Sequence, residues 1–380
     1  MKNKALDLIT YTGVYWNGKL YCLARDYNLL FSVNLQDGKT ELIDAIPEED
    51  VLTPLICGIM TVWNNKIIFT PNKTKKIWIY DLVSEQWQNL ILKEQDHLIG
   101  TGNICQTHIY KNKLFLVGSG YPAILCLDLE NNSCKYIKDP YNDIAARHPN
   151  PDYLYFWYFG VTLDNALYLA SNLDNYVLKF NMDTLAYDWI KIGDDNATYW
   201  GMTWDGSNFW LSPRPGGDII KWDGKNTVKH LPLPDELKQH TDYVWGIIYD
   251  GDKIVLSAIN HTNTIFIDTA NDTLQIQKQQ YTMYGQLDNG MVVSQSLDGK
   301  LTVKTGDTAH EYNPSIDMEQ LKQFYENKGL SVFNSQTLYH EAPVPSLLSL
   351  ENYLALTQKA DPQKTAADGS VGKNIWEAIR

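Results

Sequence analysis

Four aromatic residues share one local setting that suits ligand binding, because each directly precedes a glycine. They are Phe159, Trp200, Trp245 and Tyr284. Aromatic rings stack on the flat C–H faces of sugars, and neighbouring guanidinium or imidazole groups can hydrogen-bond hydroxyls or a carboxylate. The residues expected to supply those groups are Arg147, His148, Arg214 and His261. These eight side chains predict a site for a glycan or another polar small molecule.

Arg214 occupies the most distinctive loop of the chain, residues 212–218. Pro213 and Pro215 flank it, and Gly216 and Gly217 follow, so the arginine is fixed on a stiff turn. Two alternatives stay open: the arginine is a solvated surface residue, and the aromatic residues merely fill the space between packed sheets.

No motif in the sequence specifies a reaction. The chain has no Gly-x-Ser-x-Gly, His-Glu-x-x-His, phosphate-binding or calcium-binding loop pattern, and its eight histidines are scattered. We therefore assign no catalytic residue, expect no cofactor and expect no metal. A metal site assembled from several repeats remains open, since sequence spacing cannot reveal it.

The residues that would position this site belong to a repeat. In 199–211 an aromatic residue and a glycine are followed by an apolar stretch, Asp-Gly and a second apolar run, which predicts two strands joined by a tight turn. The glycine recurs at positions 160, 201, 246 and 285, in steps of 41, 45 and 39 residues, which is typical of propeller blades. Between the repeats at 13 and 160 lie 147 residues, and 62–69 and 109–116 supply two further strand pairs there. The spacing predicts seven blades.

Each repeat has a second half, in which a strand ends in an apolar residue followed by Asp or Asn. Trp87 follows Asp81 by six residues, and Tyr187 follows Asn181 by the same interval. The junctions are Tyr80-Asp81, Leu127-Asp128, Phe180-Asn181, Trp222-Asp223 and Ile267-Asp268. This pattern resembles the kelch repeat over about residues 10–312, although Gly216-Gly217 is the only Gly-Gly doublet. The resemblance implies an all-β fold: a seven-bladed β-propeller of four-stranded blades around a central channel.

The repeat stops after Pro314, which predicts a propeller over 1–313 and a short α-helical C-terminal extension over 314–380. Within the extension we expect helices at 317–326 and 346–356 and a polar linker at 361–373. These helices pack on the propeller or dock a protein partner. Residues 6–9 are predicted to close the ring, either as the outer strand of the last blade or beside the strand near 310–312.

Composition excludes several classes of protein. With 45 acidic and 32 basic residues, the net charge of −13 argues against a nucleic-acid surface. No stretch has the length of a membrane span or signal peptide, and five cysteines without close pairing predict reduced thiols. We expect a cytoplasmic protein that does not bind membranes.

Propeller topology places the connectors between blades and the loops between second and third strands on one face. The favoured hypothesis is a non-enzymatic recognition module that binds a glycan, a polar metabolite or a protein partner on that face. One alternative is a carbohydrate-active enzyme, a lyase, epimerase or glycoside-processing enzyme, in which Arg214, His148 and His261 hold and protonate the substrate. Another is an assembly scaffold that acts through the C-terminal helices.

Overall fold

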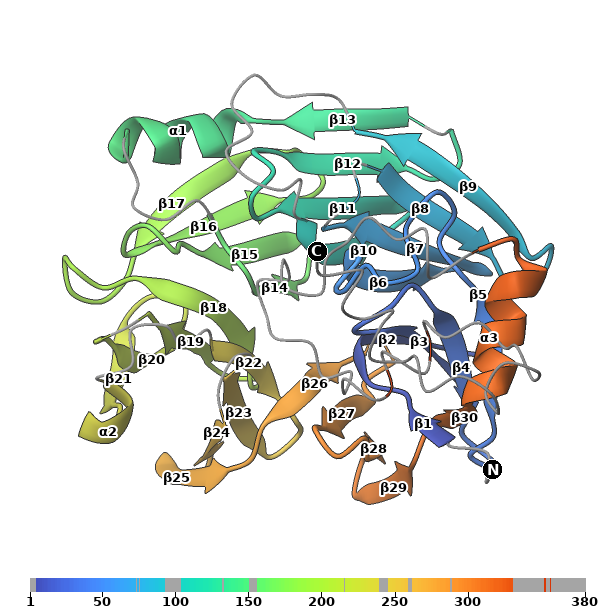
Figure 1. Ribbon diagram of the computed structural model, residues 1–380. Coiled ribbons are helices and arrows are strands. Elements are labelled where there is room, and N and C mark those ends of the chain that lie inside the picture. Colours follow the sequence, from blue (N-terminus) through green and yellow to red (C-terminus); the bar gives the residue numbers. More distant parts are fainter. Residues whose placement is uncertain are drawn as a thin grey trace, which may run out of the picture.

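The computed structural model describes residues 5–330 apart from short gaps at 73, 75, 93–103, 132, 150–155, 215, 239–244, 259–261 and 288, together with 352 and 356. The described strands form seven four-stranded antiparallel sheets arranged as the blades of a propeller (Figure 1). In each blade the chain passes through the four strands in order, from the innermost to the outermost.

The first four blades follow one another along the chain. Blade 1 consists of β2 (Thr10–Trp16), β3 (Lys19–Ala24), β4 (Leu30–Asn34) and β5 (Thr40–Asp44). Blade 2 consists of β6 (Cys57–Trp63), β7 (Lys66–Pro71), β8 (Lys76–Asp81) and β9 (Gln86–Ile91). Blade 3 consists of β10 (Ile104–Tyr110), β11 (Lys113–Gly118), β12 (Ile124–Asp128) and β13 (Ser133–Ile137). Blade 4 consists of β14 (Gly160–Leu163), β15 (Ala166–Ala170), β16 (Tyr176–Asn181) and β17 (Tyr187–Lys191).

Three more blades complete the ring. Blade 5 consists of β18 (Tyr199–Trp204), β19 (Phe209–Pro213), β20 (Asp218–Trp222) and β21 (Thr227–Pro232). Blade 6 consists of β22 (Trp245–Tyr249), β23 (Lys253–Ala258), β24 (Asn263–Asp268) and β25 (Thr273–Lys278). Blade 7 consists of β26 (Tyr281–Gln286), β27 (Val292–Ser296), β28 (Leu301–Thr305) and β29 (Thr308–Tyr312). The predicted fold class is therefore confirmed.

The middle strands of a blade are more deeply buried than its outermost strand. The second strand of blade 3, β11, is buried at every position after Lys113, because both of its faces pack against neighbouring blades. The outer strand β9 of blade 2 has no fully buried residue, and Ile91 at its end is exposed. Blade 3 thus contributes one face to a hydrophobic core shared with blade 4 and the other to a core shared with blade 2.

In most blades an Asp or Asn at the end of the third strand has a specific structural role. The Asp81 carboxylate accepts hydrogen bonds from the backbone N–H groups of Val83 and Ser84, both at 3.0 Å, and these bonds hold the pKa of Asp81 below its usual value. The same pair of backbone bonds recurs at Asp128, Asn181 and Asp223. The residue repeats in the sequence because a side-chain acceptor closes this turn.

The ring is closed by a small separate sheet. Strand β1 (Ala5–Asp7) pairs antiparallel with β30 (Ser315–Asp317), and the Leu8 N–H donates to the Pro314 carbonyl. The buried Gln295 of blade 7 accepts from the Thr10 N–H at 2.6 Å and donates to the Leu8 carbonyl at 2.9 Å. Both predicted partners for residues 6–9 are therefore wrong, because β29 is already the outer strand of blade 7 and the pairing lies three residues further along the chain.

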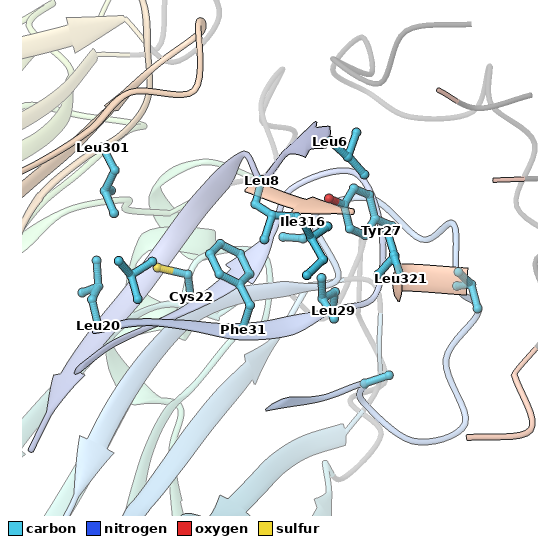
Figure 2. Close-up of a cluster of buried hydrophobic side chains, with 14 of the residues drawn as sticks. Leu6, Leu8, Leu20, Cys22, Tyr27, Leu29, Phe31, Leu301, Ile316 and Leu321 are labelled. Atoms are coloured by element: carbon cyan, nitrogen blue, oxygen red, sulfur yellow. The ribbon is translucent and has the colours of Figure 1, made fainter. Parts of the chain in front are cut away.

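Helix α3 (Met318–Asn327) follows this sheet directly, and the predicted helix at 317–326 is confirmed. The Asp317 carboxylate caps it by accepting from the N–H groups of Glu319 and Gln320. On the inner side, Tyr325 is buried and donates from its hydroxyl to the Asn28 carbonyl at 3.0 Å. Figure 2 shows Leu6, Leu8, Tyr27, Leu29, Ile316 and Leu321 in the resulting cluster. The start of the extension is therefore part of the propeller core.

Most of the remaining extension cannot be compared with prediction. Of the helix predicted at 346–356, the structure describes Asn352 and Leu356, and the linker at 361–373 lies outside the described residues. Two other described helices, α1 (Asp139–Arg147) and α2 (Asp235–Lys238), belong to connectors between blades. In the described part of the chain no helix is both long and apolar enough to cross a membrane.

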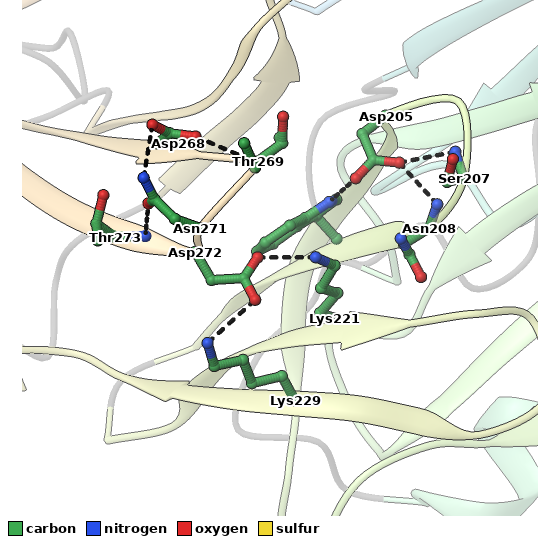
Figure 3. Close-up of polar contacts among 12 residues, drawn as sticks. Asp205, Ser207, Asn208, Lys221, Lys229, Asp268, Thr269, Asn271, Asp272 and Thr273 are labelled. Atoms are coloured by element: carbon green, nitrogen blue, oxygen red, sulfur yellow. Dashed lines mark hydrogen bonds and ion pairs between the residues drawn. The ribbon is translucent and has the colours of Figure 1, made fainter.

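An ion-pair cluster joins blades 5 and 6 (Figure 3). Asp272 of the last turn in blade 6 accepts from Lys221 at 2.7 Å and from Lys229 at 3.0 Å, both in blade 5. The Lys221 ammonium lies 4.8 Å from the centre of the Trp210 ring, and Trp210 donates to Asp205 at 2.6 Å. Burial pushes the pKa of Asp272 upward, but the two lysines outweigh it and hold that pKa below its usual value.

Loss of the closing contacts should destabilise the whole ring. We expect Leu8→Ala to lower the free energy of unfolding by about 2–4 kcal/mol, because Leu8 is fully buried beside the strand that closes the ring. Leu297→Ala is the matched control, since Leu297 is an exposed leucine of blade 7. Urea unfolding followed by tryptophan fluorescence measures both variants. Equal midpoints for the two would contradict the closing role.

Asp272→Asn should destabilise the protein near neutral pH by about 1–3 kcal/mol, because Lys221 loses its ionised partner in a largely buried place. Asparagine tolerates the left-handed backbone at this position, where φ is 57°. A depressed carboxyl pKa stabilises the fold above the usual Asp pKa, and that contribution is lost as the pH falls through the folded-state value. The stability difference between wild type and Asp272→Asn should therefore shrink from pH 7 to pH 3. Asp188→Asn, at an exposed position of β17, is the control in the same chemical unfolding series.

Candidate functional site

The loop-rich face predicted from topology is held together by backbone hydrogen bonds between connectors and loops. The Phe156 N–H donates to the Ser119 carbonyl at 3.0 Å, and the Asn172 N–H donates to the Phe156 carbonyl at 2.9 Å. In blade 5 the Arg214 N–H donates to the Thr198 carbonyl at 2.9 Å. In these blades the loop between the second and third strands is thus hydrogen-bonded to a connector between blades. The loops and the connectors therefore lie on the same face.

Phe159 occupies the central end of this face. Its backbone forms a parallel bridge with Gly201 of blade 5, and the Met202 N–H donates to its carbonyl at 3.1 Å. A Cβ added at Gly201 would come within 2.5 Å of the Phe159 side chain, and one at Gly246 within 3.5 Å of its ring. The half-buried ring therefore lies against the innermost strands of blades 5 and 6. Within their own blades Gly160 pairs with Leu169 and Gly201 with Ser212, so the two glycines hold equivalent positions, as the repeat predicted.

Trp200 and Arg214 form a stacked pair beside that position. Trp200 is buried, and the Arg214 guanidinium lies 5.0 Å from the centre of its ring. Arg214 also donates to the Asn172 carbonyl at 2.6 Å, across the boundary between blades 5 and 4. The tryptophan packs between blades, with Tyr158 edge-on at 5.7 Å. Arg214 thus joins two loops of the face and stays half-exposed on it.

Arg147 and His148 lie further out, at the end of α1. Both approach the Asp174 carboxylate, Arg147 Nε at 2.9 Å and His148 Nε2 at 3.2 Å. The Arg147 guanidinium lies 4.2 Å from the centre of the Trp189 ring on β17 and 5.0 Å from that of Tyr176 on β16. Since β17 is the outer strand of blade 4, these contacts fasten α1 to the rim of the blade. The structure does not bring Arg147 and His148 to Phe159.

Tyr284 lies deeper along its strand than its place before a glycine suggested. It stands next to Asp250, the residue after β22 at the opposite end of the blade from the loop-rich face. Burial, followed by the charge of Asp250, raises the pKa of the Tyr284 hydroxyl. Asp250 in turn lies 3.6 Å from Lys304 of blade 7. Tyr284 is therefore separated from the predicted aromatic group.

Two of the predicted binding residues, Trp245 and His261, cannot be placed relative to Phe159. Trp245 is the first residue of β22, and its side chain lies outside what the structure describes. His261 lies outside the described residues altogether. Of the eight predicted side chains, the structure gathers Phe159, Trp200 and Arg214 at one place, and ligand binding by them stays a prediction.

A polar network missed by the sequence analysis lies beside Phe159, between blades 3 and 4. His108 of β10 is 3.2 Å from Gln106 Oε1 through Nε2 and 2.8 Å from Thr162 Oγ1 through Nδ1. With the amide oxygen accepting, the imidazole carries its proton on Nε2 and accepts from the threonine hydroxyl. Blade 3 lacks the aromatic-glycine pair, so no repeat signal marks these residues.

The surroundings keep His108 uncharged. The residue is half-buried, and its burial among protein atoms lowers the pKa of His108 to about 4. No acidic partner offsets the burial among the causes of the shift. Near neutral pH the group therefore acts as a fixed hydrogen-bonding residue.

The described residues include no group of three or more His, Cys, Asp or Glu side chains placed to hold a metal ion. The described structure contains no disulfide, and burial raises the pKa of Cys22 and of Cys57 to about 12. These two thiols are therefore protonated near neutral pH and have no nucleophilic character there.

Comparison with known proteins identifies the fold without a family. No protein-family model and no curated protein matches the sequence. A streptogramin B lyase structure is 15% identical with a TM-score of 0.55, over 76% of this chain and 90% of that one. A catalytically inactive histidine-to-alanine variant of virginiamycin B lyase from Staphylococcus aureus, bound to quinupristin, is 14% identical with a TM-score of 0.57, over 78% and 97%. BamB from Moraxella catarrhalis is 13% identical with a TM-score of 0.52, over 78% and 85%.

These similarities support the seven-bladed propeller, and at such identities they show the fold alone. Membership of the kelch family stays an expectation, since no family model matches. The neighbours include lyases and BamB, so the fold is compatible with more than one kind of function.

The charge state of His108 should appear in the pH dependence of stability. Its folded-state pKa of about 4 is below the usual 6.5, so the stabilisation is complete above pH 6.5 and is lost as the pH falls toward 4. We expect about 1–2 kcal/mol of this loss between pH 7 and pH 5 in wild type, and its absence in His108→Gln. His230→Gln, at an exposed position of β21, is the control. An NMR titration of the His108 ring with a midpoint above 6 would contradict the assignment.

Proposed function

We propose that this protein is a non-enzymatic recognition module that binds a glycan or another polar small molecule at the central end of its loop-rich face. The observation that carries the proposal is the position of Phe159. Its half-buried ring lies against Gly201 and Gly246, so two neighbouring blades leave room for an aromatic surface where three blades meet. The adjacent Arg214 and the His108 network supply polar groups of the kind that orient a ligand.

Recognition is favoured over catalysis by the chemistry of His108. A general base works best when its pKa is near the working pH, whereas burial lowers the pKa of His108 to about 4. Its ring nitrogens are bonded to Gln106 and Thr162, and neither partner is an acid or a base. Such a network holds a side chain in one orientation, which suits selective binding.

The enzymatic alternative has one specific observation in its favour. Among the described histidines, His108 is the one on an innermost strand, and two of the structural neighbours are lyases. A carbohydrate-active or other lyase reaction at this place would require a ligand that raises the pKa of His108. Turnover of a bound sugar or polar metabolite would support this alternative over the proposed function.

A scaffold acting through the C-terminal helices is less favoured. Helix α3 buries Leu321 and Tyr325 against blade 1, so its apolar side is already used within the chain. Protein partners would therefore be expected on the loop-rich face. A cytoplasmic location is retained as part of the proposal, and it accords with five cysteines that form no disulfide in the described structure.

The proposed function is tested by screening a glycan array and a library of polar metabolites against the full chain. Ligands found for wild type should bind Phe159→Ala at least about tenfold more weakly, as expected for the loss of a stacking aromatic ring. Phe324→Ala, on α3 and half-buried, is the matched control and should bind normally. Isothermal titration calorimetry measures the affinities. Undiminished binding by Phe159→Ala, or no ligand at all for wild type, would contradict the proposal.

A further inference from the structure

We propose that the boundary between blades 3 and 4 contains a subsite for the hydroxyl groups of an uncharged sugar, built by Gln106, Ser119 and Asn172. The inference rests on the proposed function, since the subsite adjoins Phe159. It adds which residues hydrogen-bond the ligand and predicts that the ligand is uncharged. It depends on buried polar atoms that have no hydrogen-bond partner within the part of the chain that the structure describes.

Asn172 is the clearest of these residues. Its side chain is fully buried, and among the described residues neither the amide nitrogen nor the amide oxygen finds a hydrogen-bond partner. Ser119 is also fully buried with an unpartnered hydroxyl, and Gln106 is 5% exposed with an unpartnered amide nitrogen. Buried polar groups are nearly always paired, because an unpaired one loses its bonds to water without replacement. Four such atoms on three residues indicate a missing polar partner.

These residues surround one short segment of the chain, 156–160. Ser119 and Asn172 both hydrogen-bond the backbone of Phe156, one through its carbonyl and the other through its N–H. At the other end of the segment, a Cβ added at Gly160 would meet Gln106 Oε1 at 2.6 Å. The segment therefore connects the three residues to Phe159. Phe156 and Phe159 are both half-buried, so rotation of their side chains would open the subsite toward the loop-rich face.

The unpartnered atoms define what the ligand must offer. Asn172 needs both a donor and an acceptor, Gln106 needs an acceptor, and the Ser119 hydroxyl takes either. A sugar hydroxyl donates and accepts at once, whereas a carboxylate or phosphate only accepts and would leave the Asn172 oxygen unsatisfied. The aromatic rings at 156 and 159 offer faces for the C–H groups of a sugar.

The charges around the subsite also favour an uncharged ligand. His108 hydrogen-bonds Gln106 and is uncharged near neutral pH, so it brings no positive charge to the subsite. Arg214 donates to the Asn172 carbonyl and stacks on Trp200, on the blade 5 side of the loop. Arg147 is paired with the Asp174 carboxylate of the same loop. An anion bound among Gln106, Ser119 and Asn172 would lose its hydration without gaining a counter-charge.

The selectivity is tested with matched probes on the full-length protein. Glucose, galactose, mannose and N-acetylglucosamine are compared with glucose 6-phosphate, glucuronate and galacturonate by ligand-detected NMR and calorimetry. We expect at least one neutral sugar to bind at least tenfold more tightly than its charged counterpart. Binding of the charged sugars alone would overturn this inference and leave the proposed function standing. If the library screen finds ligands but no neutral sugar among them, the inference fails in the same way.

The role of Asn172 is tested by Asn172→Leu, which keeps the size of the side chain and removes its amide. We expect a tenfold or greater loss of sugar affinity together with a higher Tm without ligand, because the unpaired buried amide is gone. The matched control is Asn175→Leu in the same loop, where the buried amide donates to the Asp194 carbonyl at 2.8 Å, and its Tm should fall.

A purely structural role for Asn172 gives the opposite result. Its leucine variant would then melt below wild type, as expected for Asn175→Leu, and the inference would be overturned. Ordered water as the sole partner would appear as a raised Tm in Asn172→Leu with unchanged sugar affinity, and this too would overturn it.

Discussion

The constraint on which the rest of the structure depends is that every blade must be covered on both faces. Middle strands such as β11 are buried along almost their whole length, so a blade without a neighbour would expose a hydrophobic sheet. The ring must therefore close, and the last boundary packs Leu20 and Cys22 of blade 1 against Val293 and Leu301 of blade 7. Hydrophobic contact has no direction, so the β1 and β30 pairing and the buried Gln295 fix the alignment of the two ends.

The two faces of the ring differ in how uniform they are. On one face the turns after the third strands repeat the same capping bonds, as at Asp81 and Asp223, and Asp272 reaches from such a turn to Lys221 of the previous blade. On the other face the loops differ from blade to blade. The unusual chemistry, including Asn172 and the Trp200–Arg214 stack, gathers in the loops of blades 3 to 5. The repeated capping bonds and the proposed binding site thus lie on different faces of the ring.

The connector between blades 3 and 4 determines the geometry of the candidate site. Its helix α1 is fastened to the rim of blade 4, where Asp143 accepts from Tyr187 and Trp189 and where Arg147 pairs with Asp174. Two further backbone bonds hold Phe156 between the loops of both blades. Three residues further along the chain, Phe159 packs against the innermost strands of blades 5 and 6. Arg147, which the sequence analysis predicted to bind ligand, instead holds this connector in place through Asp174. Ligand binding by Phe159 stays a prediction.

The sequence by itself determined the features that arise from local patterns. The glycines of the repeat recur at regular steps, so the number of blades followed from their spacing, and an Asp or Asn closes the turn after the third strand in most blades. The helix was predicted to begin at Asp317, and Asp317 caps α3. Only the tertiary structure decided what depends on contacts between distant segments. A three-residue strand such as β1 carries no pairing signal, and neither Tyr284 nor His108 has neighbours in sequence that reveal its surroundings. The physical reason is that a propeller site forms where different blades meet, and those boundaries exist only once the ring has closed.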